Sequence, residues 1–266
     1  MQVPKGVKLQ MANKKFYDFK NIATDSLDIY VYGEIISGGL DSKWDSTDVC
    51  FQDFQNALDN LGDKKIVNLY INSVGGSVFT TQGIVAMLQR TKDKGIVINS
   101  YIDGIGASCA SFLPMVSSNI YAYNSSMLMV HKPMSMAMGN SNDLQTQIDM
   151  LNKIEDSVML PIYMSKAKDG ITEDQITKMM ADETWLSATE MSDIFDITIL
   201  DDNKDLVACI DNKSILNNYK NIPKDLKAKL LTKPKVKPVE VVEDVINQVD
   251  VEELELAKAR LQLELL

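Results

Sequence analysis

The chain has 266 residues, of which 45% are hydrophobic and 24% are charged, and its net charge is −10 at pH 7. This length and apolar fraction suffice for one α/β domain with an appendage. The negative charge argues against nucleic acid or an anionic membrane as the main partner, since both attract a basic surface. Because no apolar run is long enough to span a bilayer, we expect no membrane span and a cytoplasmic protein.

Histidine and cysteine are scarce. Cys50, Cys109 and Cys209 lie far apart and lack metal-ligand spacing, so we expect no disulfide framework, no metal site and no cofactor. His131 is the single histidine of the sequence. Any histidine-dependent chemistry must therefore use this residue.

Strand and helix patterns alternate after a polar stretch at 1–25, for which we expect a flexible N-terminal segment. Strands are predicted at 27–31, 66–71 and 96–102. Apolar residues at helical spacing predict a helix between the first two strands, ending at Gly62, with Asp45, Ser46 and Thr47 as candidates for its N-cap. Such alternation is typical of an α/β fold.

A glycine pair, Gly75 and Gly76, separates the second strand from the next predicted helix. This order presents backbone N–H groups at the positive end of a helix. The stretch matches neither the phosphate-loop nor the dinucleotide-binding pattern. A tight turn between strand and helix would explain the glycines equally well.

The third strand leads into a run of small residues around Ser108 and then a helix to Met115, which Pro114 should kink or shorten. Strands are predicted at 120–123 and 127–131, and a flexible stretch at 134–142. A long helix at 143–168 carries an apolar stripe, which we expect to dock on the core or on a neighbouring subunit.

Capping-box patterns that start at Thr172 and Ser187 predict two short helices, and a closing strand follows at 197–200. The composition then changes. Residues 223–240 are rich in lysine and proline and predict an extended linker. Residues 241–266 are acidic and leucine-rich, and predict a helical interaction tail.

Ser108 and His131 together suggest nucleophilic catalysis. A serine hydroxyl needs a base within hydrogen-bond reach, and a sharp strand-to-helix turn with small neighbours exposes the side chain. The N–H of Cys109 could then face a developing oxyanion, with the N–H of Gly76 as a second donor. Taken singly, Ser108 could be a helix N-cap and His131 an ordinary residue at a strand end.

Four blocks of sequence resemble, in the same order, those of the Clp protease proteolytic subunit (ClpP) family: 72–77, 104–108, 127–133 and 185–188. The resemblance covers about residues 15–200. The stretches 15–17, 30–35 and 179–185 are more similar to ClpP-related head maturation proteases of tailed phages and prophages. The resemblance implies a ClpP/crotonase-like ββα superhelix, to which this chain adds a helical C-terminal extension. It also implies metal-free serine peptidase activity and ring-like homo-oligomers, with the stretch 134–168 forming the contact between rings.

Carried over by position, the resemblance makes Ser108 the nucleophile and His131 the general base, with Gly76 and Cys109 as oxyanion N–H donors. The acid of the triad falls on Glu183, where many relatives have aspartate, and Asp182 is the alternative. Val74 stands where the family usually has proline, which should loosen the glycine loop without touching the triad.

We therefore interpret residues 26–222 as a serine peptidase domain that cleaves capsid or scaffold protein during phage head maturation, in the host cytoplasm or the assembling procapsid. Three alternatives remain open. The chain could be an ATPase-dependent degradative subunit, a crotonase-type acyl-CoA enzyme, or an inactive scaffold for head assembly.

Overall fold

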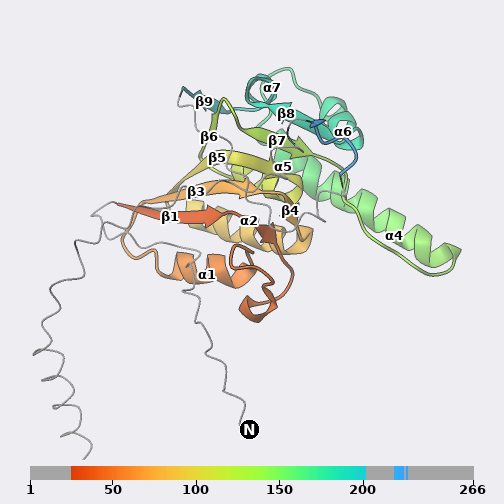
Figure 1. Ribbon diagram of the computed structural model, residues 1–266, viewed down its shortest axis with the longest axis horizontal. Coiled ribbons are helices and arrows are strands. Elements are labelled where there is room, and N and C mark those ends of the chain that lie inside the picture. The colour runs from red at the N-terminus through yellow and green to blue at the C-terminus, as the bar shows by residue number, and fades with distance from the viewer. Residues whose placement is uncertain (1–24, 202–218, 225, 227–266) are drawn as a thin grey trace, which may run out of the picture. The chain divides into compact units, whose positions relative to one another are not determined.

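Five parallel strands form the main path of the sheet in this computed structural model, in the order β1–β3–β5–β6–β9 (Figure 1). Their bounds are Ser26–Val31, Ile66–Ser73, Val97–Ala107, Asn119–Tyr123 and Thr198–Leu200. The structure describes residues 25–201, 219–224 and 226. The predicted mixed α/β fold with a parallel sheet is confirmed. The predicted tail at 241–266, Cys209, and nearly all of the predicted N-terminal segment and linker lie outside the described residues.

The long strand β5 pairs with two different strands along its length. Its first half pairs with β6 from Asn99 to Ile102, whereas Ile105 to Ala107 pair with β7 (Met127–Val130). A short antiparallel strand, β8 (Thr184–Ser187), continues the sheet beyond β7. The end of β5 thus exchanges β6 for β7 as its neighbour on one side, while Gly106 still pairs with Ser73 of β3 on the other.

Helices pack around the sheet (Figure 1). The described helices are α1 (Phe51–Asp59), α2 (Val78–Asp93), α3 (Phe112–Met115), α4 (Ser141–Ile154), α5 (Leu160–Met164), α6 (Glu173–Ala181) and α7 (Ala188–Ile194). Alternate residues of β1, β3 and β5 are buried against them, including Ile29, Leu69 and Ile98. The predicted capping boxes at Thr172 and Ser187 are confirmed at the starts of α6 and α7.

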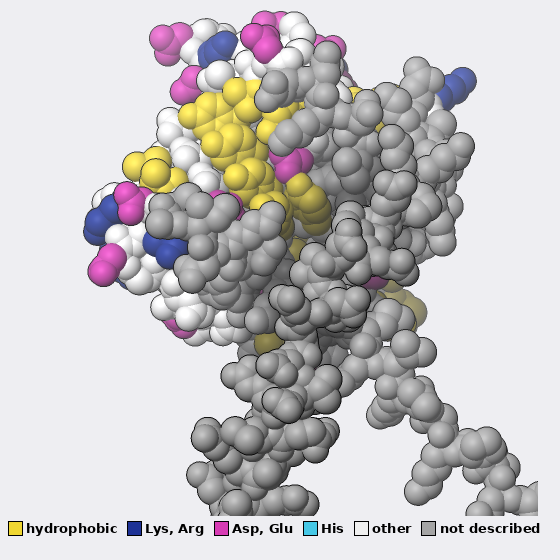
Figure 2. Space-filling view, turned by 60° about the vertical axis from the view of Figure 1, so that its left-hand side comes forward, with side chains coloured by type: hydrophobic (Ala, Val, Ile, Leu, Met, Phe, Trp, Pro, Cys, Tyr) yellow, Lys and Arg dark blue, Asp and Glu magenta, His cyan; other side chains and the backbone are white. Residues whose placement is uncertain are grey.

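The opposite set of strand residues forms a tyrosine row across four strands. Tyr30, Tyr70, Tyr101 and Tyr121 occupy matching register positions and stack with ring centroids 4.8 to 5.1 Å apart. Such rows arise because parallel strands in register align equivalent side chains on one face. Figure 2 shows a band of hydrophobic side chains on the face that it presents, with acidic side chains beside it.

One predicted helix start is wrong, and one predicted shortening is confirmed. The N-cap of α1 is Cys50, not one of Asp45, Ser46 and Thr47, because the Asp53 carboxylate accepts the Cys50 N–H and completes a capping box. The helix behind the residue 108 turn is shortened as Pro114 predicted: a 3-10 turn spans Ser108–Ser111, and α3 has only four residues.

The predicted long helix starts earlier and ends earlier than its pattern indicated. Asn140 caps α4, a π-helical turn spans Glu155–Met159, and α5 ends at Met164. No residue of α4 is buried. Of its apolar stripe, Ile154 packs against the main core, whereas Leu144 and Ile148 are exposed. The helix α4 projects from the rest of the described chain (Figure 1).

Among the described residues, no helix is both long enough and apolar enough to cross a membrane. The same residues contain no group of histidine, cysteine and carboxylate side chains that could hold a metal ion.

Candidate active site

Ser108 stands where β5 ends and the 3-10 turn begins. Its φ angle is +54°, in the left-handed region that non-glycine residues rarely adopt. Its neighbours Ala107, Cys109 and Ala110 are small and buried, which leaves room for this sharp turn. Strained backbone of this kind persists only where its surroundings hold it, and it is common at functional sites.

Hydrogen bonds made by Ser111 and Tyr163 hold the turn at Ser108 in place. The Ser111 hydroxyl donates to the Ser108 carbonyl at 2.5 Å, and its oxygen lies 2.7 Å from the hydroxyl of Tyr163. Because the Ser111 proton is used on the carbonyl, Tyr163 must donate to Ser111. Tyr163 is fully buried between Phe112 and Phe195, so this support is rigid.

The strand β7 ends at Val130, one residue earlier than predicted, and His131 follows it directly. Because β5 and β7 are parallel and Ala107 pairs with Met129, the residues that follow the two strands, Ser108 and His131, lie at the same edge. The Ser108 Oγ and the His131 Nε2 lie 2.7 Å apart, in hydrogen-bonding contact. The structure thus brings together the two residues that the sequence singled out, although 23 positions separate them.

The His131 ring is only 6% exposed. Burial lowers the pKa of the histidine below its ordinary value of 6.5, and the charge of Glu183 opposes this shift. The ring is therefore neutral at pH 7, and a neutral Nε2 can accept the proton of the serine.

Of the two candidate acids, Glu183 lies at the site. It is 9% exposed, its φ angle is +50°, and its charge acts on His131. Asp182 instead caps the end of α6, and its exposed carboxylate pairs with Lys178 at 2.7 Å. In the part of the chain that the structure describes, no hydrogen bond joins the Glu183 carboxylate to the His131 ring. Its two oxygens accept the N–H groups of Lys220 and Asn221, at 3.0 and 2.7 Å.

The glycine pair forms the short strand β4 (Gly75–Gly76), which pairs with β2 (Glu34–Ile35). Both glycines have positive φ angles, +93° and +145°. A Cβ on Gly75 would lie 2.7 Å from the Cβ of Ser108, and a Cβ on Gly76 would lie 2.2 Å from the Ile35 carbonyl oxygen. Neither position therefore accepts a side chain.

The backbone N–H groups of Gly76 and Cys109 both act on the Cys109 thiol. Burial raises the pKa of this thiol to about 11, and the two N–H groups oppose the rise. Both donors thus lie beside the turn that carries Ser108. Their predicted role as oxyanion donors stays a prediction.

Tyr219 is a residue of the site that the sequence analysis missed. Its ring packs edge-on against His131 and Trp185, with centroids 5.6 and 5.9 Å away. Its hydroxyl donates to the Val74 carbonyl at 2.5 Å. The Ser108 side chain also interacts with this hydroxyl and opposes the rise of the Tyr219 pKa that burial causes. No local motif marks Tyr219, because each of these contacts spans many positions of the sequence.

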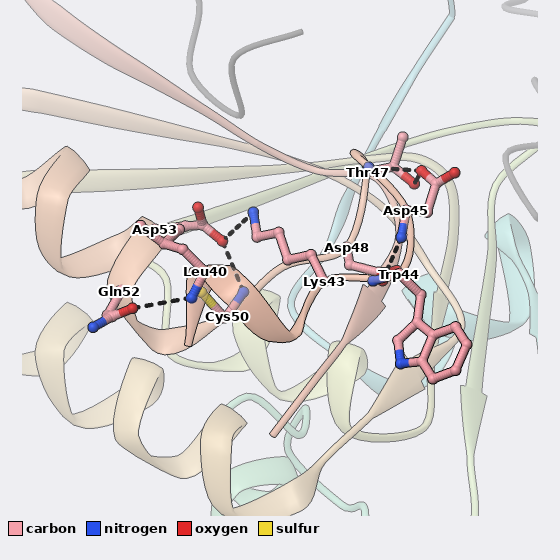
Figure 3. Close-up of polar contacts among 9 residues, drawn as sticks. All are labelled: Leu40, Lys43, Trp44, Asp45, Thr47, Asp48, Cys50, Gln52 and Asp53. Carbon is pink, nitrogen blue, oxygen red and sulfur yellow. Dashed lines mark hydrogen bonds and ion pairs between the residues drawn. The ribbon is translucent and has the colours of Figure 1, made fainter. Parts of the chain in front are cut away.

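A cleft of about 750 Å³ begins beside the glycine pair and continues past Pro133 and Met134. One wall is the loop before α1, drawn in Figure 3. Asp48 holds this loop by accepting the N–H groups of Trp44 and Asp45, both at 3.0 Å. Trp44 is almost fully exposed, and Figure 3 shows its ring extending away from the carboxylates of the loop.

Comparison with known proteins relates this chain to one family. The sequence pattern of one family, described as Clp protease, matches residues 23–194. The ATP-dependent Clp protease proteolytic subunit of Porphyromonas gingivalis is 26% identical over 135 residues, which are 50% of this chain and 58% of that protein.

Two further relatives are similar. Subunit 2 from Synechococcus sp. (strain CC9605) is 27% identical over 129 residues, 48% of this chain and 62% of that protein. Subunit 1 from Prochlorococcus marinus (strain NATL2A) is 34% identical over 98 residues, 35% of this chain and 47% of that protein. The matched stretch thus spans about half to three fifths of the length of these relatives.

Proposed function

Because the chain belongs to the Clp protease family, we propose that it is a serine endopeptidase with Ser108 as nucleophile and His131 as general base. The observation that carries the proposal is the 2.7 Å contact between the Ser108 Oγ and the His131 Nε2. Such a contact is what activates a serine hydroxyl, which is a weak nucleophile by itself.

The neutral ring of His131 accepts the Ser108 proton while the Oγ attacks the carbonyl carbon of the scissile peptide bond. The N–H groups of Gly76 and Cys109 stabilise the negative charge on the former carbonyl oxygen. Glu183 stabilises the imidazolium through its charge, since it raises the His131 pKa.

The imidazolium then donates its proton to the leaving amine as the C–N bond breaks, which leaves an ester between the substrate and Ser108. Water attacks this ester with His131 again as the base. Release of the acid product restores the Ser108 hydroxyl. The cycle uses neither metal nor cofactor.

We propose capsid or scaffold protein of a phage or prophage as the substrate, cleaved during head maturation in the host cytoplasm or the assembling procapsid. The support is the similarity of the stretches 15–17, 30–35 and 179–185 to that branch. The proposal includes a peptidase domain at 26–222, a flexible segment at 1–25, a linker at 223–240 and a helical tail at 241–266 that binds an assembly partner.

A second candidate is the ATPase-dependent degradative subunit. It is favoured by the names of the curated relatives, which are ATP-dependent Clp protease proteolytic subunits. For either candidate we propose a ring-like homo-oligomer, because the exposed stripe of α4 needs a partner that its own described chain does not supply.

The first test is covalent labelling of the full chain with a fluorophosphonate probe, which reacts with an activated serine. We expect one label, at Ser108, that Ser108→Ala abolishes and that Ser192→Ala, a change at an α7 serine remote from the dyad by sequence and element, leaves in place. Labelling that survives in Ser108→Ala, or is absent in the wild type, would contradict the peptidase proposal. It would favour the acyl-CoA enzyme or the inactive scaffold.

The second test separates the two substrate classes. The chain is co-expressed with a phage major capsid protein as candidate substrate, and the capsid protein is then followed in lysate depleted of ATP. We expect cleavage at defined sites with the wild type and none with Ser108→Ala. Degradation that occurs only when ATP and an unfolding ATPase are added would favour the second candidate instead.

A further inference from the structure

The stretch 219–224, together with Leu226, lies on the candidate active site of its own chain. Its residues contact the nucleophile, the base and the acid. We propose that this stretch, the 219–226 segment, is an intramolecular inhibitor that must leave before a substrate can bind. The inference rests on the proposed peptidase function and concerns the regulation of that site.

Tyr219 blocks the approach to the nucleophile. Its hydroxyl interacts with the Ser108 side chain and donates to the Val74 carbonyl, and its ring covers one side of His131. An attacked carbonyl carbon must come within about 3–3.5 Å of the Ser108 Oγ. The Tyr219 ring against His131 and its hydroxyl bond to the Val74 carbonyl put this side chain beside that approach, so in the proposed inhibited state a peptide and Tyr219 cannot occupy it together.

The next two residues hold the acid. The N–H groups of Lys220 and Asn221 donate to the two oxygens of Glu183, and the Asn221 side-chain amide donates to the Asp182 carbonyl at 2.8 Å. Hydrogen bonds to a carboxylate are stronger than those between neutral groups. Because they engage both oxygens, the docked segment keeps Glu183 from pairing with the ring of His131.

Apolar side chains anchor the segment to the end of β5. Leu226 is 4% exposed and belongs to a small hydrophobic cluster with Ile105, Ala107 and Met129, against which Ile222 packs. This cluster is separate from the main core. The segment therefore docks on a surface that the folded domain already presents, and its release leaves the main core intact.

One feature limits the stability of the docked state. The indole N–H of Trp185 is buried beside Tyr219 and has no acceptor among the described residues. A buried donor without a partner is unfavourable, and release of the segment would expose it to water. The docked segment can thus be displaced by a peptide that provides an acceptor.

The test measures the rate of fluorophosphonate labelling at Ser108 in the full chain. Tyr219→Ala removes the blocking ring, and Asn221→Pro removes one N–H donor to Glu183. We expect each change to raise the rate about tenfold. Asn221→Pro loses one hydrogen bond to a charged group, and Tyr219→Ala loses its bond to the Val74 carbonyl together with its ring contacts, and either loss shifts the docked population by about that factor. Tyr121→Ala, in the tyrosine row of the sheet, is the matched control and should leave the rate unchanged.

A synthetic peptide of residues 217–228 provides the second arm. Added to the Tyr219→Ala chain, it should lower the labelling rate towards that of the wild type, whereas the same peptide with alanine in place of the tyrosine should not. Tyr219→Phe keeps the ring and loses the hydroxyl, and its rate should lie between those of the wild type and Tyr219→Ala.

The outcomes separate the two proposals. If Ser108→Ala abolishes labelling while Tyr219→Ala and Asn221→Pro are labelled at the wild-type rate, the inhibitor proposal is wrong. The peptidase proposal is then unaffected. If Tyr219→Ala slows labelling at an unchanged unfolding midpoint, the segment supports the site, which also overturns the inhibitor. If no variant is labelled, the peptidase proposal fails.

Discussion

Gly75 lies directly against Ser108. A Cβ at position 75 would come within 2.7 Å of the Ser108 Cβ and of the Ala107 carbonyl oxygen, and within 3.2 Å of the Cys109 nitrogen. Contacts under 3.0 Å cannot persist, so something would have to move. The neighbours are backbone and a short side chain, which have little freedom. The conformation of the turn at Ser108 therefore depends on the missing side chain of Gly75.

We expect Gly75→Ala to lower the rate of peptide cleavage about a hundredfold, because a displacement of about 1 Å in a catalytic group has an effect of that size. The readout is kcat on a fluorogenic peptide, together with fluorophosphonate labelling. Gly95→Ala is a matched control: the φ angle of Gly95 is +83°, and its Cβ would meet nothing within 4 Å. This control carries the same kind of backbone strain but should keep full activity.

The dependence of activity on acid pH follows from His131. Burial lowers the pKa of this histidine below 6.5, and catalysis requires the neutral ring. The midpoint of the acid limb should therefore lie below pH 6.5, and activity should fall as the pH drops through the lowered pKa. The acid limb of kcat/KM against pH gives this value directly.

Glu183→Gln should shift that acid limb to still lower pH. The Glu183 charge raises the His131 pKa, and the neutral amide removes this effect. The chains with Glu and with Gln at position 183 are best compared in the Tyr219→Ala background. The 219–226 segment bonds to Glu183, so its release would otherwise add to the effect of the substitution. Asp182→Asn, at an exposed carboxylate paired with Lys178, should leave the limb unchanged. A limb that moves upward in Glu183→Gln would contradict this role of Glu183.

The sequence predicted the parts of the site that local patterns encode. Small residues around Ser108 indicated a sharp turn, and strand patterns placed Ser108 and His131 at strand ends. Parallel strands that end at the same edge bring such residues together, and the structure confirms the contact. Four ordered blocks suggested the Clp protease family, and the match over residues 23–194 confirms that family.

Other parts could not be predicted because they depend on tertiary contacts. The hydroxyl of Tyr219 bonds to a carbonyl 145 positions away, and no periodicity encodes such a pair. The contact of Gly75 with Ser108 is likewise a close approach of two separate backbones. Cys50 caps α1 only because Asp53 folds back onto it, whereas propensity alone favoured Asp45, Ser46 and Thr47.

Tyr163 supports the Ser108 turn through Ser111, so Tyr163→Phe should destabilise the protein. The phenylalanine keeps the packing but leaves the Ser111 oxygen without its buried donor. We expect a loss of about 1–2 kcal/mol in the free energy of unfolding, measured by urea denaturation. Tyr121→Phe, in the partly exposed tyrosine row, should have less effect. Equal effects would show that the bond to Ser111 contributes nothing.

The exposed stripe of α4 should mediate assembly. Leu144 and Ile148 are 40% and 49% exposed, and no residue of α4 is buried in its own described chain. Leu144→Glu with Ile148→Glu places charges on this stripe, which disfavours its burial. We expect a smaller species in sedimentation velocity. The matched control is Gln145→Glu, a charge at another exposed position of the same helix. An unchanged assembly in the double variant would exclude α4 as the contact.

Lys132, the residue after His131, forms an ion pair with Glu155, which directly follows α4. Lys132 pairs with Glu155 at 2.9 Å, where the Glu155 side chain is 6% exposed and that of Lys132 is 48% exposed. Lys132→Met leaves the buried carboxylate without its partner. It should lower the free energy of unfolding by about 1–3 kcal/mol, because the Glu155 carboxylate is shielded from water that could replace the lysine.

The double variant Lys132→Met with Glu155→Gln tests whether the pair itself is the cause. Because the neutral amide needs no counter-charge, we expect the double variant to be more stable than Lys132→Met alone, with a coupling energy of about 1 kcal/mol. Urea denaturation of the four chains measures this coupling. Strictly additive effects would show that Lys132 acts through packing alone, and that the end of α4 and the His131 strand are not linked by charge.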